Sequence, residues 1–240
     1  MTGGLHKVGE AEDRGAKAEA DQEGRLRVRY IDMETWPRRE HFRLFSTFNH
    51  PHAGLCANVD LTAFRPFVKQ RGLTFTVAWV YVLARVANSI PEFRQRIRGD
   101  QVVEHDIVHP TVTVLTDNDL FSFCYFEYVD DFREFAPRAA EQMAYVREHP
   151  MLKNKPEDDV LYMTAMPWVS FTAVDHPMQL HPADSVPRLA WGKFFEEGER
   201  LKMPLQVQGH HCLLDGVHFG RFYQRVQELL DDPESVLNAG

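Results

Sequence analysis

The sequence predicts an α/β fold, a single-domain two-layer sandwich in which a large mixed sheet is flanked by helices. Helical and strand-like patterns are interspersed without the regular strand–helix–strand alternation that is typical of a doubly wound parallel sheet. No internal repeat and no linker divides residues 25–231. An apolar content of 44%, with 12% aromatic residues, is enough to build a sizeable core.

The two ends of the chain differ in composition from this domain. Residues 1–24 are small and charged, and Leu5 and Val8 are their main large apolar side chains. Such a segment buries too little surface to offset its ordering entropy, so we expect a disordered leader. Residues 232–240 are acidic in part and are expected to form a frayed tail.

Apolar residues at three- and four-residue steps predict the helices. The strongest pattern covers Thr76–Ile90, and a proline ends it. Further helices are expected over residues 38–48, 62–70, 131–149 and 217–230, and a short helix after Pro91 is expected to carry Phe93 and Ile97.

Alternating apolar and polar residues predict the strands. They are expected at residues 26–30, 55–61, 102–105, 111–115, 121–128, 160–164, 168–174, 189–195 and 201–208. Turns are expected at Asn49–Gly54 and Asp117–Asp119, and polar or proline-rich loops at residues 150–159 and 175–187.

Composition also excludes several classes of protein. A net charge of −8 without a basic run argues against a nucleic-acid or anionic membrane partner. Three separated cysteines, with no CxxC pair, fit a reducing compartment and exclude a disulfide framework. There is no apolar run of bilayer length and no apolar signal core at the N-terminus, so a cytoplasmic protein is expected.

The segment Gly209–Gly216 is the candidate functional motif, because it joins a strand-like run to a helical one. It holds His210 and His211, and Asp215 follows four residues after the second histidine. A histidine can accept a proton near neutral pH, whereas the aspartate can equally be a helix N-cap. A metal site with His218 is a weaker alternative, since adjacent histidines of a strand point to opposite faces.

Several separated motifs resemble one family closely, in the order in which that family has them. They are Trp36–Phe42 (WPRREHF), Pro91–Arg94 (PEFR), Asp130–Arg133 (DDFR), Pro167–Phe171 (PWVSF) and His210–Arg221 (HHCLLDGVHFGR). The chain therefore resembles the type A chloramphenicol acetyltransferases from about Val28 to Leu230. The HHxxxDG pattern alone is shared by a wider superfamily of CoA-dependent acyltransferases.

The resemblance implies the chemistry of the histidine motif. His211 matches the general base, which removes a proton from a substrate hydroxyl so that its oxygen attacks the thioester of acetyl-CoA. The family transfers the acetyl group directly, so Cys212 is expected to be a small buried residue and not a nucleophile. Asp215 matches a residue that pairs with an arginine, here Arg38, and this pair is expected to hold the histidine loop.

The resemblance also implies an oxyanion donor and exposes departures from the family. Thr164 stands where the family has a serine hydroxyl for the tetrahedral intermediate, whereas Ser170 does not match that serine. Ala190 replaces a threonine that helps to hold a water near the oxyanion. The loop Asn49–Gly54, near the acceptor pocket, lacks the usual cysteine.

Substrate-binding residues follow from the same resemblance. Phe45 and Phe121 match aromatic positions of the acceptor pocket. Trp168 is expected to line the pantetheine tunnel, and Lys193 to lie near the nucleotide phosphate. Acetyl-CoA is implied as a co-substrate, with no permanently bound cofactor and no metal.

Family members are homotrimers with active sites between subunits, and the apolar run Phe121–Tyr128 is a candidate for such an interface. The implied reaction is acetylation of the primary hydroxyl of chloramphenicol, which confers antibiotic resistance. Two alternatives stay open: the same chemistry on another alcohol or amine in biosynthesis, and an inactive trimer that binds small molecules.

Overall fold

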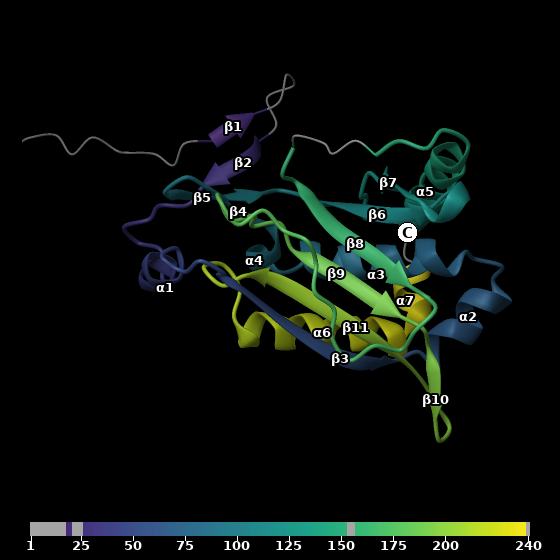
Figure 1. Ribbon diagram of the computed structural model, residues 1–240. Helices are drawn as coiled ribbons and strands as arrows, with labels where there is room; N and C mark the ends of the chain where they lie inside the picture. Colours follow the sequence, from purple (N-terminus) through teal and green to yellow (C-terminus); the bar gives the residue numbers. More distant parts are fainter. Residues whose placement is uncertain (1–17, 21–25, 153–156, 239–240) are drawn as a thin grey trace, which may run out of the picture.

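A computed structural model of the chain describes residues 18–20, 26–152 and 157–238. It confirms the predicted fold class, a mixed α/β sandwich with a large mixed sheet and helices packed on it (Figure 1). Most of the predicted leader lies outside the described residues.

The helices and strands follow one another along the whole described chain. The helices are α1 (Arg39–Phe45), α2 (Phe64–Gln70), α3 (Phe75–Asn88), α4 (Pro91–Arg94), α5 (Phe132–Glu148), α6 (Gly216–Asp231) and α7 (Pro233–Leu237), with a 3-10 turn at Asp117–Asp119. The strands are β1 (Ala18–Ala20), β2 (Leu26–Tyr30), β3 (His52–Asp60), β4 (Gln95–Arg98), β5 (Gln101–His105), β6 (His109–Leu115), β7 (Phe121–Tyr125), β8 (Val160–Met166), β9 (Arg188–Gly192), β10 (Phe195–Glu197) and β11 (Arg200–His210).

The large sheet has seven strands and is mixed. Its order is β10-β11-β9-β8-β6-β7, and β3 pairs with the free side of β11. The pairs β6–β8 and β8–β9 are parallel, and the other pairs are antiparallel. The long strand β11 is thus held by β3 up to the pair His210–His52, at the start of the histidine motif.

A second, four-stranded antiparallel sheet has the order β1-β2-β5-β4. It lies at the same end of the molecule as α1 (Figure 1). Two of its features differ from expectation. Ala18–Ala20 of the predicted leader form β1, and Ile97 lies in β4 because the short helix ends at Arg94.

The C-terminal segment also has more structure than the sequence predicts. Asp232 caps α7 by accepting a hydrogen bond from the N–H of Ser235. Val236 and Leu237 are buried, with 1% and 3% of their surface exposed. Helix α7 therefore contributes to the core, although acidic residues flank it.

The two faces of the large sheet differ in chemistry, because successive side chains of a strand point to opposite sides. One face carries residues such as Leu205, Val207 and Met163, which join the core with the almost fully buried helix α3. The opposite face carries polar residues of β11, namely Gln206, Gln208 and His210, and we call it the polar face.

The predicted strand at residues 168–174 is wrong. Trp168 and Val169 are 70% and 53% exposed, and the segment crosses the end of β9 without joining the sheet. Gly192 allows this close approach, because a Cβ there would lie 2.7 Å from the carbonyl oxygen of Val169. The predicted strand 189–195 is likewise divided into β9 and β10.

Within the described part of the chain, we find no helix with the length and apolar character needed to cross a membrane.

Candidate active site

The histidine motif is a tight turn between β11 and α6. The N–H of His211 donates to the carbonyl oxygen of Pro51 at 2.7 Å, and the N–H of Leu214 donates to that of His210 at 3.0 Å. The turn is therefore tied both to the residue preceding β3 and to its own strand. A backbone anchored in this way can present a side chain in a fixed position.

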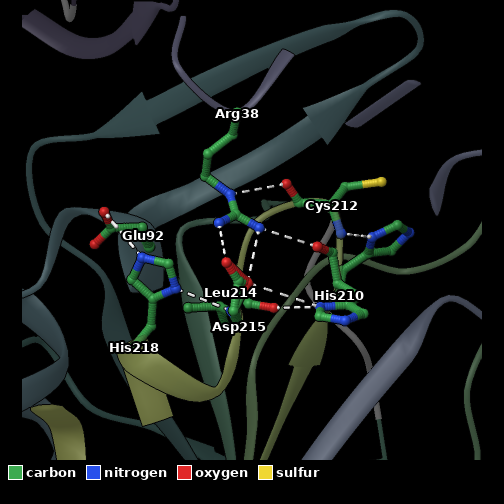
Figure 2. A network of polar contacts seen from close by, with 8 residues as sticks. Arg38, Glu92, His210, Cys212, Leu214, Asp215 and His218 are labelled. Carbon is green, nitrogen blue, oxygen red and sulfur yellow. Dashed lines mark hydrogen bonds and ion pairs between the residues drawn. The ribbon is translucent and has the colours of Figure 1, made fainter. Parts of the chain in front are cut away.

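Arg38 and Asp215 form an ion pair beside the turn. The guanidinium donates to both carboxylate oxygens, at 2.5 and 3.2 Å, and to the carbonyl oxygens of His211 and Cys212, at 3.1 and 3.3 Å (Figure 2). The hydrogen bond from Arg38 is the main cause that lowers the pKa of Asp215. Arg38 thus binds both the backbone carbonyls of the turn and the carboxylate of Asp215.

The ring of His211 has the geometry of a proton acceptor. Its Nδ1 lies 2.8 Å from the carbonyl oxygen of Leu214, so Nδ1 must carry the hydrogen and donate it. The other nitrogen, Nε2, then has a free lone pair, and the side chain is 32% exposed. The Asp215 carboxylate lies 3.9 Å from Nδ1, farther than that carbonyl, so its main partner is Arg38.

Phe45 contacts this ring, because the two ring centroids are 4.0 Å apart at an angle of 32°. It projects from the last turn of α1, the helix that begins directly after Arg38. One short segment of sequence thus supplies both the arginine and the aromatic side chain beside His211.

His210 and Cys212 have structural surroundings. His210 is 3% exposed, its Nδ1 accepts a hydrogen bond from the N–H of Cys212, and burial lowers its pKa to about 4. Cys212 is fully buried, and burial raises the pKa of its thiol to about 12. A thiol with such a pKa is protonated at neutral pH, which argues against a nucleophile.

Thr164 lies on β8, where its register partner is Ala190, whose own partner on β11 is Gln206. Its side chain is on the polar face and is partly exposed. Within the residues that the structure describes, its hydroxyl has no hydrogen-bond partner. The side chain of its register partner Ala190 is a methyl group and offers this hydroxyl no hydrogen-bond partner.

Thr164 and His211 do not meet within one chain. His211 lies five residues beyond Gln206 and two strands away from Thr164. At about 3.3 Å per residue and about 4.8 Å per strand spacing, their Cα atoms are separated by roughly 19 Å. Both were expected in one site, and the structure does not bring them together within one chain.

The CoA-side candidates lie near Thr164 and far from His211. Lys193 donates its N–H to the carbonyl oxygen of Val169, which brings Lys193 and Trp168 to one corner. This corner lies where β8 and β9 end, opposite to the end of the sheet at which β11 leads into the histidine turn. Lys193 and Trp168 are both exposed.

Phe121 starts β7, four strands from β11 at the edge of the sheet. Its side chain is 48% exposed. It lies opposite Leu115 and contacts Phe123, whose register partner is Thr113. The structure therefore does not bring Phe121 to Phe45, the other predicted acceptor residue.

A cavity of about 670 Å³ lies beside the histidine turn. The segment before β3 forms one wall with Phe48, Asn49 and Pro51, and residues 179–186 form another. The 49–54 loop was expected near the acceptor pocket. Residues 179–186 were given no role, because a composition rich in proline and histidine was their only signal.

The three histidines considered as metal ligands have other partners. The Nδ1 atoms of His210 and His218 accept backbone N–H groups, and that of His211 donates to a carbonyl. In the described ranges no three His, Cys, Asp or Glu side chains gather in a way that would hold a metal ion.

The Arg38–Asp215 pair leads to a first prediction. Arg38→Met should lower the free energy of unfolding by about 3 kcal/mol, the low end for breaking a buried pair, because Asp215 is 28% exposed. Urea unfolding at pH 7 measures this. Since the pair lowers the pKa of Asp215, its contribution is present above the ordinary carboxyl pKa and is lost as pH falls through the lowered one.

The neighbouring Arg39→Met variant is the matched control. Arg39 pairs with Glu34 and Glu40 at the surface, so it should change stability by no more than about 1 kcal/mol. Equal losses in both variants would contradict the anchoring role of Arg38.

Comparison with known proteins gives a consistent result. The family model for chloramphenicol acetyltransferase matches residues 26–227. A chloramphenicol acetyltransferase from Klebsiella sp is 33% identical over 206 residues, which cover 84% of this chain and 93% of that protein. One from Proteus mirabilis is 28% identical, covering 87% and 97%.

Solved structures agree with this match. A chloramphenicol acetyltransferase superposes with a TM-score of 0.74 and 28% identity, covering 83% of this chain and 98% of that one. The dihydrolipoamide acetyltransferase of Azotobacter vinelandii has a TM-score of 0.61 and 20% identity, covering 82% and 88%, and shares the fold. The sequence motifs, the geometry of the histidine turn and these matches lead to one conclusion: the chain belongs to the chloramphenicol acetyltransferase family.

Proposed function

We propose that this protein transfers an acetyl group from acetyl-CoA to the primary hydroxyl of chloramphenicol, with His211 as the general base. One observation carries the proposal: the His211 ring keeps Nε2 free while Nδ1 is bound to a carbonyl oxygen. Relatives that match most of the chain are named chloramphenicol acetyltransferases, and this name supports chloramphenicol as the acceptor.

The proposed reaction proceeds in two steps without an acyl-enzyme. His211 Nε2 takes the hydroxyl proton while the substrate oxygen attacks the thioester carbonyl, which gives a tetrahedral intermediate and an imidazolium. The Thr164 hydroxyl donates a hydrogen bond to the oxyanion. The intermediate then collapses, the C–S bond breaks, and the imidazolium returns its proton to the leaving CoA thiolate.

The separation of the two groups supports an oligomer whose active sites lie between subunits, and we propose the homotrimer that the family resemblance implies. His211 with Phe45 would come from one subunit, and Thr164 with Trp168 and Lys193 from its neighbour. Trp168 would then line the pantetheine arm, and Lys193 would bind a phosphate. The exposed apolar side chains Leu120 and Phe121, at 64% and 48%, can be buried in such an interface.

Mixing two inactive variants tests this assembly. His211→Ala and Thr164→Val chains, unfolded together and refolded in equal amounts, should recover about a quarter of wild-type activity, because random cyclic pairing gives each site one chance in four of two intact halves. Each variant refolded alone is the control. No recovery from a mixture that forms trimers would contradict a shared site.

Thiol release from acetyl-CoA, with chloramphenicol as acceptor, tests the reaction itself. Release with the drug and none without it is expected, together with an ester at the primary hydroxyl by mass spectrometry. The altered loop, with His50 and His52 close to each other at a ring separation of 5.7 Å, favours a second candidate, the same transfer to a different alcohol or amine. Release only with another acceptor would establish that candidate.

An inactive binding trimer would release no thiol with any acceptor. We also propose a cytoplasmic location, where acetyl-CoA is available, and no permanently bound cofactor.

A further inference from the structure

One peptide group lies between two histidine rings. The carbonyl oxygen of Leu214 accepts the Nδ1–H of His211 at 2.8 Å. The N–H of the same peptide, which belongs to Asp215, donates to Nδ1 of His218 at 2.9 Å (Figure 2). The two rings therefore hold opposite ends of one planar unit.

The hydrogen bond to His218 fixes where this ring carries its proton. Because Nδ1 accepts, the hydrogen of the neutral ring is on Nε2. That nitrogen lies 3.4 Å from Oε1 of Glu92. The hydrogen bond from His218 is the main cause that lowers the pKa of Glu92, which keeps the carboxylate ionised as an acceptor.

The Glu92–His218 pair is firmly placed. His218 is the third residue of α6 and is 5% exposed. Glu92 is on α4, whose Phe93 stacks on Phe222 of α6 with ring centroids 4.8 Å apart. Packing between the two helices thus sets the position of the carboxylate relative to the imidazole.

We propose that Glu92 and His218 are positioning residues for the general base His211. They act through the Leu214–Asp215 peptide group, whose carbonyl they keep turned toward the His211 ring. If this peptide turned, His211 would lose the acceptor that holds the hydrogen on Nδ1, and its Nε2 would no longer be kept free. Consecutive hydrogen bonds, such as those from Glu92 through His218 and the peptide to His211, also strengthen one another.

Arg38 does not supply this function. It binds the carboxylate of Asp215 and the carbonyl oxygens of His211 and Cys212, and none of these belongs to the Leu214–Asp215 peptide. The turn thus has two separate supports, one for its start and one for the peptide that contacts the catalytic ring. The inference rests on the proposed function of His211.

Steady-state kinetics of three variants test the inference. His218→Ala and Glu92→Ala should lower kcat by about tenfold to a hundredfold, the loss typical of removing the partners that orient a functional histidine, with little change in KM. His218→Gln should restore most of the kcat, because a glutamine at this helix position can accept the Asp215 N–H. His149→Ala, at an exposed histidine, is the control.

Nitrogen-15 NMR of labelled histidine gives a readout that a merely structural role would not move. We expect His211 to hold its hydrogen on Nδ1 in the wild type and to become a mixture of tautomers in His218→Ala and Glu92→Ala. Thermal unfolding identifies which variants are folded. If His218→Ala does not fold, the kcat values and the His211 tautomers of Glu92→Ala and His218→Gln test the inference instead.

Two results would overturn the inference: folded variants with wild-type kcat, or an unchanged His211 tautomer in both alanine variants. This failure is distinct from failure of the proposed function. Full activity of His211→Ala would refute the general base, whereas the NMR signal would still report whether the peptide couples the two rings.

Discussion

His211→Ala should lose at least about 10³-fold in kcat for acetyl transfer to chloramphenicol, which lies in the upper half of the usual general-base contribution. The side chain is about one third exposed and its Nε2 is free, so it is positioned to take the hydroxyl proton. Without it, the hydroxyl must lose its proton to water. KM for acetyl-CoA should change little, because the side chains proposed to bind CoA are Trp168 and Lys193, and both remain in this variant.

Thiol release measured for the wild type, His211→Ala and His149→Ala separates this role from a general loss of structure. The exposed His149 makes its contacts with Tyr145 on α5, so its removal should leave kcat unchanged. Retained activity in His211→Ala would rule out the general base. Thermal unfolding of each variant shows whether the fold is intact.

Thr164→Val should lower kcat by about 10²–10³-fold, because it removes the proposed oxyanion donor while keeping the shape of the side chain. Stability should hardly change, since within the described residues this hydroxyl has no hydrogen bond to lose. Thr164→Ser should retain most of the activity, because it keeps the hydroxyl and loses only a methyl group.

Ser170→Ala is the matched control for this prediction. Its hydroxyl donates to the carbonyl oxygen of Lys193 at 2.7 Å and therefore has a structural partner. We expect a kcat close to that of the wild type. A larger loss in Ser170→Ala than in Thr164→Val would contradict the assignment of Thr164.

Much of the fold could be predicted from the sequence, where local patterns and burial agree. The pattern of Thr76–Ile90 corresponds to α3, and Asp131 caps α5 by accepting from the N–H of Arg133. Errors occurred where tertiary contacts determine the backbone. Alternation over residues 168–174 resembles a strand, but that segment instead crosses close over Gly192.

The candidate site could also be predicted only in part, because some of its contacts depend on tertiary packing. Arg38 was expected to pair with Asp215 at the histidine turn and Phe45 to line the acceptor pocket, and the structure places all three beside the turn. Glu92 was given no role there and His218 was considered only as a metal ligand, although an aspartate followed three residues later by a histidine at a helix start suggests a cap. Their contact across 126 positions of sequence depends on the packing of α4 against α6.

The two ends of the large sheet carry the two halves of the proposed site, and this has a consequence for enzyme kinetics at low concentration. A lone folded chain would have a base without an oxyanion donor, and a donor without a base. Specific activity would then follow the fraction of chains that are assembled, by mass action. On dilution below the dissociation constant of the oligomer, the rate per chain would fall steeply, and activity itself would report assembly.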